Sequence, residues 1–314
     1  MQKRIYLVTG GAGFIGSHLC ERLLREGESV RVLDNFSSGK KENLLDLGGE
    51  VEAINADIRD VQAVKDAMRG VHVVFHEAAL GSVPRSVADP VTTHDTNITG
   101  TLNVLLAARD AGVRRVVYAS SSSVYGETPT LPKHEGITPQ PLSPYALSKL
   151  AGEHYINIFK HVYGFEAVSL RYFNIFGPRQ DPESEYAAVI PKFVTALLNG
   201  VPPTVYGDGQ QSRDFTYVEN VVEANLLASE AEGVAGQFFN VACGGRYTLL
   251  ELLIKIKEIL GSDINPVHEP GRAGDVKDSQ ASIDAAERAL GYRVKVDFDE
   301  GLRRTVAWFK AQAR

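Results

Sequence analysis

Short, mostly apolar runs alternate with amphipathic helical stretches along the first half of the chain. Each run is typical of a strand that is buried on both faces of a sheet. The predicted strands cover residues 4–8, 29–33, 51–56, 71–75, 116–119 and 167–170. Because strands and helices alternate up to about residue 165, the pattern predicts an α/β fold with a doubly wound parallel sheet. Ligands bind at the carboxyl ends of the strands in such a sheet.

The pattern becomes less regular beyond residue 170. We expect residues 1–170 to form a nucleotide-binding domain and residues 171–314 to form mainly a smaller C-terminal α/β lobe for the substrate. Segments of this lobe are expected to interleave with the first domain. Amphipathic helices are predicted near residues 249–260 and 283–290 and around 302–309, and we assign them to packing.

A glycine-rich turn joins the first predicted strand to the first helix. Glycines 10, 13 and 16 give the spacing Gly-x-x-Gly-x-x-Gly. Gly10 permits a tight turn, Gly13 lets the backbone approach a pyrophosphate, and Gly16 allows close contact between helix and strand. Free amides at the helix N-terminus then suit a phosphate. Because it lies between a strand and a helix, this motif predicts a Rossmann-type dinucleotide site.

An acidic residue, Asp34, ends the second predicted strand. A carboxylate there accepts hydrogen bonds from ribose hydroxyls and repels a 2′-phosphate, so it favours NAD over NADP. The competing interpretation is an acid in a surface loop.

The third motif runs from a serine-ended strand into a helix. The serines are residues 120–123, and the helix is predicted to begin at Pro144 with Ser143 as its cap. Tyr145 and Lys149 are four residues apart and therefore share one helix face. A nearby lysine cation lowers the pKa of a tyrosine, so the pair predicts a proton-transfer device. An ordinary amphipathic helix is the alternative, and the motif gains weight from the serines and the glycine turn.

Composition narrows the choice of partner. The net charge of −6 argues against nucleic acid or an anionic membrane, and we expect neither as a partner. Cys20 and Cys243 show no disulfide or metal spacing, which fits a reducing compartment. His76 has no neighbouring ligand, so we expect a packed histidine and no metal. With no signal-peptide pattern or membrane-length apolar run, we expect a cytoplasmic protein.

Together these motifs resemble the extended short-chain dehydrogenase/reductase family, and most closely its nucleotide-sugar 4-epimerases. The resemblance covers residues 9–308 and implies NAD as cofactor and a UDP-sugar as substrate. The expected cofactor contacts are Gly10, Gly13, Phe14, Ile15, Gly16, Asp34, Asn35, Asp57, Ile58, Ala78, Ala79, Asn97, Tyr145, Lys149 and Tyr172. The expected substrate contacts are Ser82, Ser122, Asn174, Gln180, Ala188, Val189, Tyr206, Arg213, Arg272, Asp275 and Ser279. Glu77 departs slightly from the family, which often has Asn or Gln nearby.

The serines also distinguish between reactions of the resembling enzymes. Related 4,6-dehydratases carry acids at the positions of Ser122 and Ser123, and related decarboxylases carry Glu at the second. Because neither position has a carboxyl here, dehydration and decarboxylation lack their acid–base group. The reaction that remains is oxidation and re-reduction of the sugar. The resemblance then implies that Tyr145 takes the proton of the sugar 4-hydroxyl, Ser121 binds the reacting oxygen, and Lys149 keeps the tyrosine anionic.

Which sugar turns over is a finer question. In the resembling epimerases a bulky residue at the position of Ser279 excludes N-acetyl groups, so the small Ser279 predicts that N-acetylated UDP-hexoses are accepted as well as UDP-glucose and UDP-galactose. A uronate 4-epimerase is the runner-up, with Arg85 as the cation for the sugar carboxylate. A non-catalytic NAD-sensing protein is a third alternative, although it would often have lost Tyr145 or Lys149. The resemblance also suggests a homodimer built from residues 102–108 and 151–159, which could equally be domain core.

Overall fold

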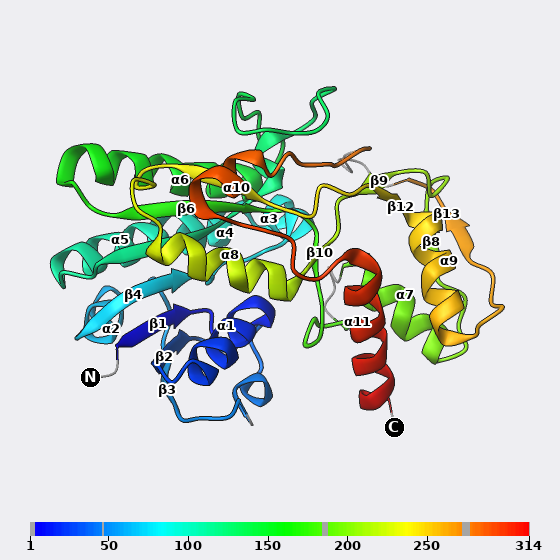
Figure 1. Cartoon of the computed structure of the whole chain (residues 1–314), viewed down its shortest axis with the longest axis horizontal. Helices are drawn as coiled ribbons and strands as arrows, with labels where there is room; N and C mark the ends of the chain where they lie inside the picture. Colours follow the sequence, from blue (N-terminus) through cyan, green and yellow to red (C-terminus); the bar gives the residue numbers. More distant parts are fainter. Residues whose placement is uncertain (1–3, 46, 184–187, 272–276, 314) are drawn as a thin grey trace.

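A parallel sheet forms the centre of the computed structural model, which describes residues 4–45, 47–183, 188–271 and 277–313 (Figure 1). Seven strands pair in the order β11-β6-β5-β4-β1-β2-β3, all of them parallel. Their bounds are β1 (Ile5–Thr9), β2 (Ser29–Asp34), β3 (Val51–Asn55), β4 (Val71–His76), β5 (Arg115–Ser121), β6 (Ala167–Tyr172) and β11 (Phe238–Val241). The predicted Rossmann-type α/β fold is confirmed.

Side-chain alternation along the strands creates two separate cores. Tyr6 and Val8 of β1 pack on one face of the sheet, and Leu7 packs on the other. The first face carries α1 (Phe14–Arg25), α8 (Val218–Glu230) and α10 (Asp284–Leu290). The second face carries α2 (Val61–Ala67), α5 (Gly100–Asp110) and α6 (Pro144–Tyr163). Because helices cover both faces, the strands can be apolar throughout.

The strand order of the sheet changes direction between β1 and β4. From β1 the chain adds β2 and β3 on one side, whereas β4, β5 and β6 extend the other side. The carboxyl ends of β1 and β4 therefore border the crevice where doubly wound sheets bind ligands. The glycine turn follows β1 at this point.

A smaller body lies beside the sheet, at the right of Figure 1. It contains α7 (Val189–Leu198), α9 (Leu249–Leu260) and α11 (Phe298–Gln312) around a core of its own. Its short strand pairs are β7 (Ile175–Phe176) with β10 (Thr216–Tyr217), β8 (Thr204–Tyr206) with β13 (Val267–Glu269), and β9 (Ser212–Arg213) with β12 (Tyr247–Thr248).

The second half of the chain does not stay in this smaller body. Strand β11 pairs with β6 at the edge of the main sheet, and α8 and α10 pack on that sheet. The sequence pattern missed β11 as a sheet strand, because four residues within an irregular region carry too little periodicity.

The helical segment between β4 and β5 is continuous but not uniform over residues 90–110. It consists of α4 (Pro90–His94), a π-helical turn η2 (Asp95–Thr99) and α5. The remaining short helices are α3 (Val83–Ala88), η1 (Lys41–Leu44) and η3 (Ser122–Tyr125). Among the described helices, none has both the length and the apolar character needed to cross a bilayer.

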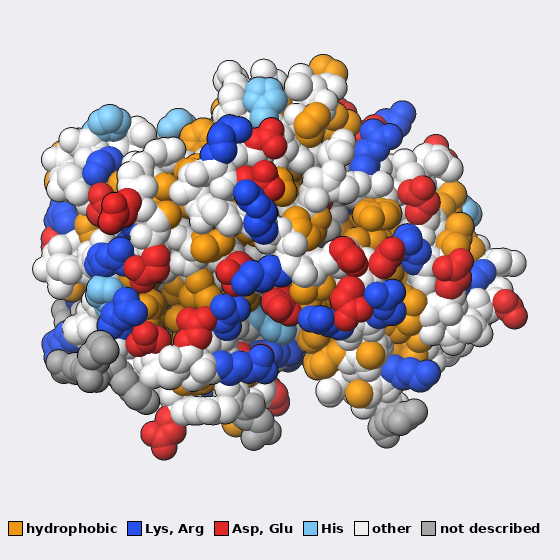
Figure 2. Space-filling model, in the orientation of Figure 1, with side chains coloured by type: hydrophobic (Ala, Val, Ile, Leu, Met, Phe, Trp, Pro, Cys, Tyr) orange, Lys and Arg blue, Asp and Glu red, His pale blue; other side chains and the backbone are white. Residues whose placement is uncertain are grey.

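Acidic and basic side chains are intermixed over the face shown in Figure 2. Neither sign forms a continuous patch on that face. Patches of hydrophobic side chains are visible between the charged groups.

Candidate active site

The predicted proton-transfer residues meet at the carboxyl edge of the sheet. Ser121 ends β5, and Tyr145 and Lys149 lie in the first turns of α6. The helix begins as the sequence predicts, since the Ser143 hydroxyl accepts a hydrogen bond from the Ala146 amide at 3.1 Å and Pro144 follows the cap. This cap fixes where α6 starts and thereby which residues face β5.

Burial is the main cause of a raised pKa at Tyr145. A hydrogen bond with Ser121 lowers that pKa, and a charged Glu77 raises it. The pKa of Tyr145 is therefore raised overall, and the lowering predicted from the nearby lysine does not set its direction. The Lys149 ammonium lies 6.0 Å from the centre of the Tyr145 ring and donates to the Ala119 carbonyl at 2.7 Å. Burial also lowers the pKa of Lys149, to about 8.

His76 is a packed histidine, as predicted. Its Nε2 lies 2.9 Å from the Thr101 hydroxyl, which itself donates to the Asn97 carbonyl, so Nε2 carries the hydrogen. Nδ1 then accepts from the Thr9 hydroxyl at 2.7 Å. Burial lowers the pKa of His76 to about 3, so it stays neutral. The described residues contain no cluster of three or more His, Cys, Asp or Glu that could hold a metal.

The glycine turn fits a dinucleotide. A Cβ on Gly10 would lie 2.7 Å from the Ala78 amide nitrogen, so the turn can approach β4 only with glycine there. Gly13 caps α1 without any side-chain hydrogen bond, and Phe14, Ile15 and Gly16 begin the helix. Amides at such an uncapped N-terminus are available to a pyrophosphate.

Asp34 lies where the adenosine ribose is expected. Its carboxylate accepts hydrogen bonds from the amides of Ala12 and Phe36, at 2.9 and 2.8 Å. This links the end of β2 to the glycine turn, and each oxygen keeps a second lone pair for a ribose hydroxyl. The residues present therefore fit NAD.

The adenine side consists of two adjacent strand ends. Asn35 donates to the Asp57 carboxylate at 2.7 Å. The hydrogen bonds from Arg59 contribute most to lowering the pKa of Asp57, to about 2. Ile58 is buried beside this pair. The structure thus brings the predicted residues together and fixes Asp57 as an anion.

Asn97 holds the loop on the opposite side of the cleft. Its Oδ1 accepts from the Leu80 amide at 2.8 Å, and its Nδ2 donates to the Ser148 hydroxyl at 3.0 Å. Ser148 in turn donates to the Tyr145 carbonyl at 2.7 Å. Asn97 therefore ties the segment after Ala79 to the helix that carries Tyr145.

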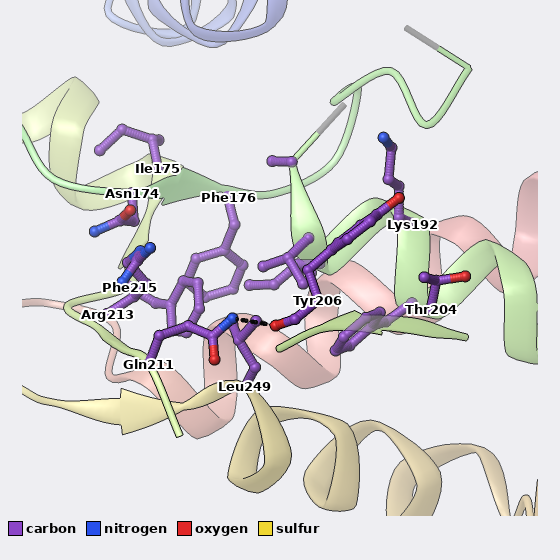
Figure 3. A pocket seen from close by; sticks show the side chains of 14 residues that line it. Asn174, Ile175, Phe176, Lys192, Thr204, Tyr206, Gln211, Arg213, Phe215 and Leu249 are labelled. Carbon is purple, nitrogen blue, oxygen red and sulfur yellow. Dashed lines mark hydrogen bonds between the residues drawn. The ribbon is translucent and has the colours of Figure 1, made fainter. Parts of the chain in front are cut away.

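A pocket of about 250 Å³, near the lower end of small-molecule sites, begins at Asn174, two residues beyond the end of β6 (Figure 3). It contains five of the predicted substrate residues: Asn174, Ala188, Val189, Tyr206 and Arg213. In Figure 3 the rings of Phe176 and Phe215 lie between Asn174 and Tyr206, so the pocket combines an apolar floor with polar ends. Gln211 donates to the Tyr206 carbonyl at 2.8 Å.

Four other predicted substrate residues are described and are not among those that line this pocket. Ser82 caps α3 by accepting from the Arg85 amide, and Ser122 begins η3. Gln180 donates to the Ile175 carbonyl at 3.1 Å. Ser279 is buried, and its amide donates to the Ser212 carbonyl at 3.0 Å. Arg272 and Asp275 lie outside the described residues.

A family model described as the NAD dependent epimerase/dehydratase family matches residues 6–242. The chain belongs to this family. The UDP-glucose 4-epimerase of Mycolicibacterium smegmatis is 40% identical over 312 residues, which cover 98% of this chain and 99% of that protein. Solved structures agree: the UDP-N-acetylglucosamine 4-epimerase of Methanobrevibacter ruminantium in complex with UDP-N-acetylmuramic acid is 43% identical, with a TM-score of 0.95 and 99% and 100% of the two chains covered.

The UDP-glucose 4-epimerase of Thermus thermophilus in complex with NAD is 41% identical, with a TM-score of 0.90 over 98% of this chain and 99% of that one. The recognised relationship to the extended short-chain dehydrogenase/reductase UDP-sugar 4-epimerases is thus confirmed. Within the family this chain groups with isomerases, and its cofactor is NAD.

Two features of this epimerase-family site were missed by sequence reasoning. Lys192 and Gln211 also line the pocket. Lys192 could have been found, because it lies three residues after Val189 and so shares its helix face. Glu77 was noted only as a departure, and nothing in its local sequence indicates its partner, Tyr172, on another strand.

Proposed function

We propose that this chain interconverts UDP-hexoses at C4 through a transient 4-keto sugar and accepts N-acetylated substrates. The observation that carries the proposal is the hydrogen-bonded Ser121–Tyr145 pair beside Lys149, at a strand end without a carboxyl at positions 122 and 123. Acid–base elimination lacks its acid there, whereas oxidation at a carbinol carbon requires only a proton acceptor and a hydride acceptor.

The chain's own groups perform the proton chemistry. Bound NAD supplies a hydride acceptor that later returns the hydride to the sugar. Tyr145 takes the proton of the 4-hydroxyl, and Ser121 holds the same oxygen. Lys149, which is buried within 6.0 Å of the tyrosine ring, compensates the phenolate charge. Since burial opposes the phenolate, this compensation is needed.

The pocket retains the nucleotide while the sugar turns over. We assign Asn174, Tyr206 and Arg213 to the UDP moiety, with the rings of Phe176 and Phe215 as apolar floor. The pocket begins at Asn174, two residues after Tyr172 at the end of β6, so a nucleotide bound there directs its sugar toward the proton-transfer residues.

The direct test uses purified protein without added NAD. It is incubated separately with UDP-N-acetylglucosamine, UDP-glucose and UDP-glucuronate, and the 4-epimers are resolved by chromatography or NMR. Conversion of the N-acetyl sugar supports the whole proposal, including retained NAD. Conversion of UDP-glucose alone overturns the N-acetyl specificity, and no conversion of any substrate, even with NAD supplied, overturns the reaction.

Ser279→Tyr is expected to lower activity on UDP-N-acetylglucosamine by about a hundredfold while UDP-glucose activity survives. Ser279 is small and buried, and the family resemblance assigns its position to the space near the 2-substituent, so a phenol ring there is expected to exclude an N-acetyl group. Initial rates on both sugars measure the effect. Ser279→Ala is the matched control, and thermal melting checks the fold. A folded Ser279→Tyr protein with unchanged selectivity between the two sugars contradicts the proposed role of position 279 in admitting the N-acetyl group.

A uronate 4-epimerase is the second candidate. Arg85, in the last turn of α3, is the cation that would bind the sugar carboxylate. Conversion of UDP-glucuronate alone in the same assay would support it. An NAD-sensing protein without turnover is the third alternative, and any epimerisation excludes it.

We also propose a homodimer and a cytoplasmic location. On the predicted α5 interface, Val104 and Leu105 are core residues, whereas Leu102 and Leu106 are only partly buried. An exposed apolar stripe on α6, formed by Leu147, Ile158 and Val162, offers a better surface for a second copy. Sedimentation velocity of the purified protein tests whether it is a homodimer.

A further inference from the structure

A carboxyl group that the proposed mechanism does not use lies near enough to Tyr145 and Lys149 to act on their charges. Glu77 directly follows β4, which lies beside β1 where the strand order of the sheet changes direction. Its backbone contacts the glycine turn, because a Cβ on Gly10 would lie 3.1 Å from the Glu77 carbonyl carbon. Glu77 therefore lies between the pyrophosphate turn and the catalytic helix α6.

The hydrogen bonds to Glu77 have a fixed direction. The two Nδ2 hydrogens of Asn225 go to the Val221 carbonyl at 2.9 Å and to the Tyr172 hydroxyl oxygen at 2.7 Å. Reversing this amide would place two oxygens against each other at Val221. The Tyr172 hydroxyl therefore donates its own hydrogen to Glu77 Oε1, at 2.7 Å. The carboxyl is thus held as an acceptor.

The groups around Glu77 make its charge variable near neutral pH. Burial is the main influence on Glu77 and raises its pKa to about 7. The hydrogen bond from Tyr172 on β6 and the charge of Lys149 on α6 act in the opposite direction and lower this pKa. Tyr145 on α6 is coupled to the same carboxylate. On its own strand, His76 is neutral.

We propose that Glu77 is an electrostatic residue that keeps bound NAD in its oxidised form between turnovers. This inference rests on the proposed function. A bound nicotinamide would have to lie close to Tyr145 to accept hydride from the sugar, and the Glu77 carboxylate is near enough to act on the charges of Tyr145 and Lys149. Only the oxidised ring is cationic, so an adjacent carboxylate stabilises the oxidised form over the neutral reduced form.

The turnover itself is nearly insensitive to this charge. In the oxidation step the C4–H bond breaks and its electron pair moves with the hydrogen to the nicotinamide, while the 4-hydroxyl proton moves to Tyr145. The first transfer removes a cation near Glu77, and the second removes the phenolate anion. Their effects on the Glu77 interaction oppose each other. Glu77 therefore biases the resting redox state more than the rate of epimerisation.

The test measures the redox balance of bound NAD in the loaded protein. Wild type and Glu77→Gln are equilibrated with a redox-dye couple at a fixed ratio, and the absorbance of reduced nicotinamide gives the ratio of reduced to oxidised cofactor. At pH 8 this ratio is expected to be about tenfold higher in Glu77→Gln than in wild type. At pH 5.5, where the wild-type carboxyl is protonated, the two proteins are expected to agree.

Two further variants separate charge from structure. Glu166→Gln removes a carboxylate at the opposite edge of the sheet, where it pairs with Arg115, and is expected to leave the ratio unchanged. Tyr172→Phe keeps the Glu77 carboxyl but removes its hydrogen-bond donor, which should raise the pKa of Glu77. The pH above which this variant has a lower ratio than Glu77→Gln should therefore be higher than the corresponding pH for wild type. Equal ratios in wild type and Glu77→Gln at pH 8, or a difference that persists at pH 5.5, overturn the inference. A wild-type protein without epimerase activity on any UDP-sugar overturns the proposed function, whereas epimerase activity with equal ratios in wild type and Glu77→Gln overturns this inference alone.

Discussion

Replacing Tyr145 by Phe is expected to lower kcat for UDP-sugar epimerisation by about three orders of magnitude. The phenol oxygen is the group that exchanges a proton with the sugar 4-hydroxyl, and Ser121, its hydrogen-bond partner, is too weak a base to replace it. Phe keeps the ring that packs beside Lys149. The loss should therefore be confined to kcat, with KM changed much less.

Three measurements define this result. Initial rates give kcat and KM, equilibrium titration with UDP reports the nucleotide pocket, and the retained NAD is released by denaturation and quantified. Tyr163→Phe, at the exposed C-terminal end of the same helix, is the matched control and is expected to behave as wild type. A Tyr145→Phe protein within tenfold of the wild-type kcat would show that another group carries the proton.

The second large effect is on stability, at a buried ion pair behind the active site. Arg171 donates from Nε and Nη2 to the two oxygens of Glu153, at 2.8 and 2.7 Å, and both side chains are almost fully buried. Ser120 adds a hydrogen bond to the same carboxylate at 2.5 Å. The Arg171 guanidinium also lies 3.8 Å from the centre of the Phe238 ring.

Glu153→Leu is expected to lower the free energy of unfolding by about 3–5 kcal/mol, because the guanidinium is left buried without its partner. Urea titration followed by circular dichroism measures the loss. The double variant Glu153→Leu/Arg171→Met should lose less than Glu153→Leu, since no uncompensated charge remains. Arg303→Ala, in an exposed pair with Glu300, is the control and should show no measurable change. A double variant as unstable as the single one would contradict the charge explanation.

This pair also affects catalysis through geometry. Glu153 lies one helical turn after Lys149, and Arg171 precedes Tyr172 at the end of β6. The ion pair therefore fixes α6 against the strand that leads into the substrate pocket. Part of the catalytic precision depends on residues that contact neither substrate nor cofactor.

Local pattern was sufficient to predict most of the sheet and the three motifs. The glycine turn, the acid at Asp34 and the cap at Ser143 each depend on a few neighbouring residues, and each lies where the sequence placed it. Three features depended on distant contacts instead. Strand β11 gains its place by pairing with β6, and the pKa of Tyr145 is set mainly by burial. The Glu77–Tyr172 hydrogen bond joins the residue after β4 to the last residue of β6, 95 positions apart in the chain.

The return of α8, β11 and α10 to the sheet has a consequence for how the protein is made. During synthesis the edge of β6 stays unpaired until β11, residues 238–241, has left the ribosome. Of the helices that cover one face of the sheet, α8 is synthesised shortly before β11 and α10 only after it. Neither body can close independently from a contiguous stretch of chain. Substrate range in this architecture therefore changes more readily by altering side chains and loops in place than by exchanging a whole lobe at a single junction.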